Sequence, residues 1–314
     1  MRIKKKLRTL IALSVLILVL AGAGIILKNI FLRQIRREIQ SSFEYSRLYL
    51  SAFPPTLILE KAKTYSQAPF FSAERILVTI SYRSLLTRER PFNVLIEHPV
   101  LRFIEAETEK EKKPKFSLPF SVEEGRVKEG EFYFWGKDIR YESRGINAQF
   151  MLKKQRLAIR AEAAENVFSP SPTWPKVEGK VNLFIEGRGR EIVVKKIKVE
   201  GSDFTVDGQG RLPDFSNPEL SLKMNYRANA PFIVKFLGIP FDTQGEAQGE
   251  GTLTSNEEGL SFQGDFSSSN IILNRVPMGE VRGKIDLKQR GLQVVEFNIQ
   301  KQSLQPEYVR TVSY

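Results

Sequence analysis

The chain contains no cysteine and only one histidine, His98. These absences exclude cysteine nucleophiles, zinc sites built from Cys and His, and any Ser-His-Asp triad that does not use His98. His98 precedes Pro99 at the end of a predicted strand, so we interpret it as a structural residue. We therefore predict a protein without catalytic residues, metal site or cofactor, and not an enzyme. A Ser–Lys dyad stays open, because both residue types are too common in this sequence to indicate one.

Acidic residues are missing from the first 37 positions, which carry nine Lys and Arg side chains. The formal net charge of the whole chain is +12, so only +3 is left for the remaining residues. The high pI of 9.7 therefore describes the N-terminal segment and not the body. A basic patch for nucleic acid is not indicated, because binding to phosphates needs clustered cations.

An uncharged apolar run covers residues 9–27, after a basic tail at residues 1–8. Nineteen helical residues span about 28 Å, close to the thickness of a hydrocarbon core. The cations of the tail favour a cytoplasmic N-terminus for a single-pass transmembrane anchor. The alternative is a cleaved signal peptide, with 21–23 (AGA) as the small-residue cleavage site. Either reading takes the body of the chain out of the cytoplasm.

Beyond the anchor, apolar residues at helical spacing predict a juxtamembrane helix over residues 28–43. From residue 44 to 314 the period changes to two, with mostly polar residues between the apolar ones. This pattern predicts about 17 antiparallel strands with one apolar and one wet face. We expect the apolar face to be formed by Ile76, Val78, Ile80, Val94, Ile96, Ile146, Ala148, Phe150, Leu152, Leu157, Ile159, Val181, Leu183, Ile185, Ile192, Val194, Leu220, Leu222, Met224, Ile285, Leu287, Phe297 and Ile299.

Two segments depart from the strand pattern. Residues 105–115 (EAETEKEKKPK) predict a solvated charged loop. Residues 231–238 (PFIVKFLG) predict a short amphipathic helix that proline opens and glycine closes. Its apolar side chains are Phe232, Ile233, Phe236 and Leu237, and we expect them to cover part of the apolar face.

Short stretches along the chain resemble the AsmA-like superfamily, which includes TamB. The likeness begins with the layout of a basic tail, one apolar helix and an extended β-sheet. The stretches that carry it are 73–76 (AERI), 84–86 (SLL), 94–103 (VLIEHPVLRF), 118–120 (LPF), 127–132 (VKEGEF), 237–240 (LGIP) and 249–251 (GEG). No catalytic residue is carried over, because the recurring features of this family are structural.

The resemblance implies a bridge-like lipid-transfer protein: a curled β-groove, anchored in the bacterial inner membrane, whose body lies in the periplasm. Its apolar groove would bind acyl chains and conduct phospholipids between the inner and outer membranes. TamB-like members are also associated with outer-membrane protein assembly beside a barrel partner. The resemblance therefore leaves a structural or assembly role, docked to an outer-membrane barrel, as the alternative.

The residues themselves are compatible with a groove, because one short helix cannot cover so large an apolar face. Such a face must fold on itself, meet a partner or hold an apolar ligand. An enzyme or adhesin on an extended β scaffold is a third possibility, without a motif to support it. At about 4.8 Å per strand, about 17 strands give a groove of about 80 Å. We expect this to fall short of an envelope crossing, so that the chain is an N-terminal portion of a longer protein or another chain continues the sheet.

Overall fold

A computed structural model describes residues 40, 43–51, 54–65, 70–80, 92–104, 122–136, 140–153, 156–169, 176–188, 191–213, 220–236, 241–256, 259–288 and 291–300. They form one large, curled, mixed β-sheet and a short helix, so the prediction of a mainly β protein is confirmed. The elements are β1 (Phe43–Glu44), β2 (Arg47–Ser51), β3 (Thr56–Thr64), β4 (Phe71–Ile80), β5 (Phe92–Glu97), β6 (Val100–Ile104), β7 (Val122–Trp135), β8 (Arg140–Lys153), β9 (Arg156–Ser169), β10 (Val177–Arg188), β11 (Glu191–Glu200), β12 (Phe204–Leu212), β13 (Leu220–Asn229), α3 (Ala230–Phe236), β14 (Thr243–Gln244), β15 (Glu246–Asn256), β16 (Gly259–Leu273), β17 (Val276–Lys288) and β18 (Gly291–Gln300).

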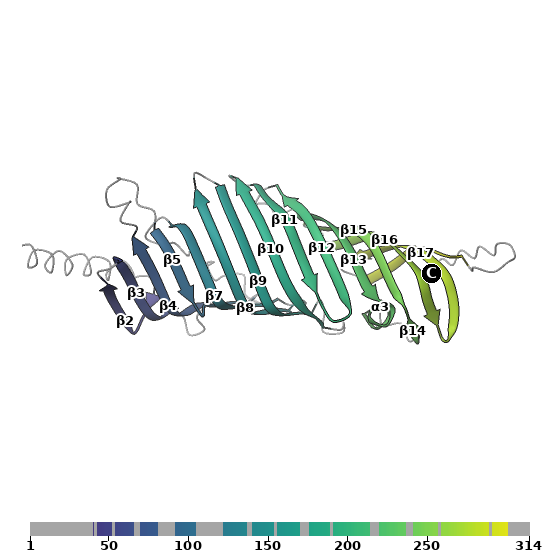
Figure 1. Ribbon diagram of the computed structural model, residues 1–314, viewed down its shortest axis with the longest axis horizontal. Coiled ribbons are helices and arrows are strands. Elements are labelled where there is room, and N and C mark those ends of the chain that lie inside the picture. Colours follow the sequence, from purple (N-terminus) through teal and green to yellow (C-terminus); the bar gives the residue numbers. More distant parts are fainter. Residues whose placement is uncertain are drawn as a thin grey trace, which may run out of the picture.

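The strands follow one another as a long meander, side by side along the long axis of the molecule (Figure 1). β1 and β2 both pair with β3, and from β7 to β13 every strand pairs with its sequence neighbours. β13 pairs with β15, and β15, β16, β17 and β18 complete the series. Several turns are tight: Arg188 faces Glu191 across the β10–β11 turn, and Lys288 faces Gly291 across the β17–β18 turn.

The expectation of a wholly antiparallel sheet is wrong at one place. β5 and β6 lie parallel to β7, whereas the other strand pairs among the described residues are antiparallel. A parallel pair needs a crossover of a dozen or more residues instead of a tight turn. Residues 105–121, which include the predicted charged loop at 105–115, connect β6 to β7 and lie outside the described residues. Strand alternation carries no information on direction, which is why the periodicity missed this crossover.

A line of bends crosses the sheet from β3 to β8. Lys61, His98, Glu129 and Gly145 have positive φ angles of 52°, 49°, 51° and 64°. Such left-handed conformations are uncommon outside glycine, and at bulges they bend a strand and shift its alternation. The register places His98 beside Glu129, because Glu97 pairs with Lys128 and Val100 pairs with Glu131. The bends are thus aligned in neighbouring strands.

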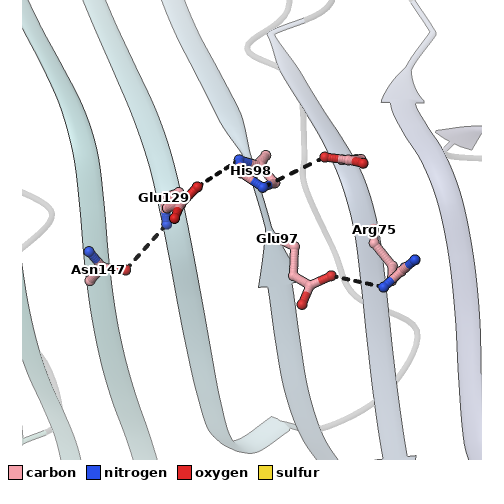
Figure 2. Close-up of polar contacts among 6 residues, drawn as sticks. Arg75, Glu97, His98, Glu129 and Asn147 are labelled. Carbon is pink, nitrogen blue, oxygen red and sulfur yellow. Dashed lines mark hydrogen bonds and ion pairs between the residues drawn. The ribbon is translucent and has the colours of Figure 1, made fainter.

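Figure 2 shows the polar contacts along the bend. His98 Nδ1 lies 3.4 Å from Glu129 Oε2, and the Glu129 N–H donates to Asn147 Oδ1 at 3.3 Å. The His98 and Glu129 side chains are mostly solvent-exposed, so their contact contributes little to stability. A backbone hydrogen bond also holds the bend: the His98 N–H donates to the Lys128 carbonyl at 2.9 Å. The predicted strand break at His98-Pro99 is confirmed, because His98 and Pro99 separate β5 from β6.

Among the described residues, the best-packed cluster lies at the N-terminal end of the sheet. Leu57, Leu59, Val78 and Val94 are between 3% and 5% exposed, and they pack in one cluster with Phe43 and neighbouring side chains. The Phe43 ring meets the Phe71 ring edge-on at 5.9 Å. Phe43 is the first residue of β1 and pairs with Thr64 of β3, so the predicted helix over 28–43 does not include its last residue. This predicted helix otherwise lies outside the described residues, apart from Gln40, which is helical.

The predicted helix at 231–238 is present as α3 and begins one residue earlier, at Ala230. It lies at the end of β13, at the margin of the sheet (Figure 1). The Phe232 ring stacks on the Phe204 ring of β12 at 4.9 Å and 20°. Residues 237–238, and the Phe236 side chain, lie outside the described part. α3 thus packs at one end of the strands.

Within the described part of the chain, no helix has the length and apolar character needed to cross a bilayer. The predicted tail at 1–8 and anchor at 9–27 lie outside that part.

Candidate functional site

One face of the sheet carries an unbroken cross-strand row of apolar residues and glycines, here called row A. Directly paired residues share a face of a sheet, so the register defines the row. From β2 to β17, row A consists of Leu48, Leu59, Ile76, Ile96, Val127, Ala148, Ala161, Leu183, Ile197, Gly208, Met224, Gly251, Gly264 and Ile285. No charged residue interrupts it.

A second row, row B, runs beside it, two residues away along each strand except β11, where the spacing is three. It consists of Leu50, Leu57, Val78, Val94, Gly125, Phe150, Ile159, Ile185, Val194, Gly210, Leu222, Leu253 and Phe262. In β17, the residue paired with Phe262 is Leu287, so row B continues at that position. Rows A and B together make a continuous apolar strip along the sheet, which we call the apolar face.

The register places every residue of the predicted groove on this face. Those outside rows A and B fall in flanking rows: Ile146, Val181 and the position of Phe297 on one side, and Leu152, Leu157 and Ile192 on the other. The positions of Ile80 and Leu220 also lie next to row B, and that of Ile299 pairs with Val281. The side chains of Ile80, Leu287, Phe297 and Ile299 lie outside the described part. The predicted residues thus share one surface, and their proposed contact with lipid stays a prediction.

Sequence reasoning missed several members of the two rows, including Leu59, Val127, Ile197 and Phe262. The miss at Ile197 has a clear cause. The pairing of β11 with β12 shifts between Val194 and Ile197, so these two inward residues are three positions apart instead of two. A strict period of two loses the frame at such a bulge. In the sequence, the only sign that Ile197 belongs to the apolar face is its apolar side chain.

Burial along the apolar face changes between its two ends. In β3, β4 and β5, row B is buried at Leu57, Val78 and Val94, and in row A Leu59 is only 4% exposed. The other row A residues here, Ile76 and Ile96, are half-buried and pack against this cluster. From β8 to β17 most of the row residues, such as Leu183, Met224 and Ile285, are half-buried. The main packing partners of these strands among the described elements are their sheet neighbours and α3. The apolar face is therefore a closed core at one end and an open surface over the rest.

Glycines and flat aromatic rings form the floor of the apolar face near its C-terminal end. A Cβ at Gly251 would lie 2.4 Å from Phe262 Cζ, and one at Gly249 would lie 2.6 Å from the Tyr226 hydroxyl oxygen. The two rings meet edge-on at 6.0 Å. Only glycine allows rings to lie against neighbouring backbone in this way. The floor here is made of ring faces and backbone.

Burial raises the pKa of the Tyr226 hydroxyl to about 12, with a smaller contribution from the charge of Asp265. The hydroxyl donates to the Asp265 carbonyl at 2.9 Å, two strands away from β13. Tyr141, also on the apolar face, is similar: burial raises its pKa, and its hydroxyl donates to Asn166 Oδ1 at 2.8 Å. The polar atoms of these two tyrosines are hydrogen-bonded, so they do not interrupt the apolar surface with an unsatisfied group.

The opposite face, here called the outer face, carries the charges. Near the N-terminal end, a cross-strand row of alternating positive and negative side chains spans five strands. Its members, each paired with the next, are Arg47, Glu60, Arg75, Glu97 and Lys128. Arg75 Nη1 lies 3.3 Å from Glu97 Oε2 (Figure 2). Such exposed pairs stabilise the fold by at most about 1 kcal/mol each. Their effect is a surface that favours water over lipid.

A hollow of about 990 Å³ opens on the outer face across β11–β17. Its charged lining side chains balance: Lys195, Lys196, Lys223, Lys284, Asp207, Glu250, Asp265 and Asp286. The charged side chains that line the hollow therefore carry no net charge that would favour either an anion or a cation. Among the described residues, no group of three or more His, Asp or Glu side chains is placed to hold a metal ion.

Comparison with protein-family models gives no match for this chain, and comparison with curated proteins gives none either.

Proposed function

We propose that the protein binds phospholipid acyl chains on its apolar face and conducts lipids between the inner and outer membranes of a bacterial envelope. The observation that carries the proposal is the pair of uninterrupted rows, A and B, left uncovered from β8 to β17 among the described elements. An apolar strip of this extent requires an apolar partner. Acyl chains meet that requirement along its whole length.

The arrangement of charge supports the same proposal. Residues such as Lys223 and Glu250 point to the outer face, while Met224 and Gly251 between them belong to row A. A phospholipid lying in the curled sheet keeps its tails against rows A and B and its head group in solvent along the open side. Each methylene removed from water contributes about 0.8 kcal/mol, which retains the tails without any specific contact.

Movement along the apolar face needs no chemical step. Consecutive places along row B, such as Ile159, Ile185 and Val194, offer similar aliphatic surroundings at intervals of one strand, about 4.8 Å. A lipid passing from one place to the next therefore meets shallow differences in free energy. The body would act as a passive guide, anchored in the inner membrane by residues 9–27 and extending into the periplasm. This setting follows the resemblance to the AsmA-like superfamily.

The test is mass spectrometry of the full chain, extracted from its membrane in a mild detergent. We expect phospholipid to remain bound after the detergent is exchanged, at more than one molecule per chain. A chain that carries no lipid under conditions in which the sheet stays folded would contradict the proposal.

A second candidate is a structural or assembly role at an outer-membrane barrel. The observation in its favour is β18, whose far edge pairs with no other described strand. An open strand edge accepts a further strand from a partner. Crosslinks from β18 to a barrel protein, in a preparation free of lipid, would favour this role over lipid conduction.

A further inference from the structure

The open part of the apolar face is not accessible along its axis from the N-terminal end. There Leu57, Val78 and Val94 of row B and Leu59 of row A are at most 5% exposed, and the half-buried Ile76 and Ile96 of row A pack against them. The predicted anchor precedes this same end in the sequence. If the proposed function holds, a lipid that leaves the inner membrane must therefore bypass the filled end and enter the groove from the side.

One long margin of the sheet offers an apolar path beside the filled end. At the ends of β6 and β7, Phe103 is 44% exposed, Ile104 is 56% exposed and Trp135 is 37% exposed. Ile104 and Trp135 are direct register partners on the face that carries Arg102 and Tyr133, whereas Phe103 pairs with Phe134 and lies on the apolar face. We call this edge, with the start of β8, the β6–β8 margin. The margin therefore exposes apolar side chains on both faces of the sheet.

Aromatic rings continue from this margin along the apolar face. The Phe103 ring lies 5.8 Å from the Phe132 ring, and the Phe132 ring lies 5.9 Å from the Tyr141 ring. The series thus leads from β6 across β7 to β8, where rows A and B become half-buried. It joins the exposed margin to the open part of the face without a charged residue between the rings.

The outer side of the same margin combines aromatic rings with cations. The Arg102 and Arg144 guanidinium carbons lie 5.7 Å and 6.0 Å from the centre of the Tyr133 ring. Glu131 accepts the Tyr133 hydroxyl at 2.8 Å, and Glu142 lies 3.6 Å from Arg144. Trp, Tyr and Arg side chains together are typical of proteins at the membrane–water interface, and guanidinium groups bind phosphate well.

We propose that phospholipid enters the apolar face sideways over the β6–β8 margin, tails first along the rings and phosphate beside Arg102 and Arg144. The occupant is a phospholipid because one edge presents both parts of its recognition, apolar rings inside and cations outside. The proposal rests on the proposed function and adds the route of entry to it.

The test compares two double variants of the full chain. In the first, Phe103→Asp and Ile104→Asp place charges on the β6–β8 margin. In the control, Met151→Asp and Val276→Asp place them at two similarly exposed apolar residues elsewhere, 51% and 50% exposed. Delipidated protein is mixed with vesicles of phosphatidylethanolamine and phosphatidylglycerol that contain a photoactivatable phospholipid. Crosslinked lipid on peptides from β10 to β13 is then measured against time.

We expect the margin variant to load about tenfold more slowly, since an apolar side chain lost from the entry path costs about one order of magnitude. Its final loading should equal that of the unmodified chain, because the apolar face itself is intact. The control should load at the unmodified rate. Equal rates for the margin variant and the unmodified chain would overturn the entry route while leaving the groove in place. No crosslinked lipid on the unmodified chain would overturn the proposed function, and the route with it.

Discussion

Replacing Leu183 and Ile285 together by aspartate is expected to strip lipid from the protein without unfolding it. Both residues belong to row A, Leu183 in β10 and Ile285 in β17. Both are half-buried, so a carboxylate at either position can reach water in the empty protein. Once an acyl chain covers the position, the charge loses that water, and the bound state bears the cost.

The size of the effect follows from the geometry of the sheet. Six strand spacings of about 4.8 Å separate the two residues, which gives about 29 Å. An acyl chain reaches about half of a hydrocarbon core, or about 15 Å, so the two carboxylates act on different chains. Each displaces about four methylenes, worth about 3 kcal/mol, which weakens retention about 100-fold at each of the two places.

The assay is lipid phosphorus per protein after detergent exchange, with circular dichroism as the check on the sheet. A matched control carries Asn182→Asp and Thr252→Asp, which add the same two charges one residue away from row A, on the outer face. The control should retain lipid like the unmodified chain. Unchanged lipid in the row A variant, or an equal loss in the control, would refute the reasoning.

Two pairs of variants test the packing, and one further variant tests the titration of Tyr226. Leu59→Ala should lower the free energy of unfolding by about 3 kcal/mol, because Leu59 is 4% exposed. Half-buried Leu183→Ala should cost less than about 1.5 kcal/mol in the same urea titration, and equal costs would contradict the distinction between a filled and an open end. Gly210→Ala should destabilise by about 2 kcal/mol, since its Cβ would lie 2.0 Å from the Ser221 carbonyl oxygen, which is backbone. At Gly125 the three atoms nearest to an added Cβ all belong to the Phe150 ring, which can turn aside, so a larger loss for Gly125→Ala would be evidence against this account. Burial raises the Tyr226 pKa to about 12 from an ordinary 10.0, so its contribution to stability is complete below pH 10 and is lost as pH rises toward 12. Tyr226→Phe should flatten that fall in stability between pH 10 and 12, measured by urea unfolding at each pH, and an unchanged slope would place the titration elsewhere.

Much of the apolar face was predictable because a strand with one wet side repeats every two residues. In β10 and β13 the alternation of Val181, Leu183 and Ile185, or of Leu220, Leu222 and Met224, identifies the inward side chains directly. The pattern fails wherever a bulge adds a residue, as before Ile197, and wherever glycine replaces an apolar side chain, as at Gly251 and Gly264. In those places the inward position can be recognised only from its partner across the sheet.

The sequence by itself determined the class of the fold, the side of each regular strand that faces inward and the short helix at α3. These are local properties, written in periods of two and 3.6 and in proline and glycine punctuation. The tertiary structure alone decided the parallel β5–β7 and β6–β7 pairs, the aligned bends from Lys61 to Gly145, and the division of the apolar face into a filled and an open part. Each of these depends on which strands become neighbours and at what register, and no residue carries that information before the chain has folded.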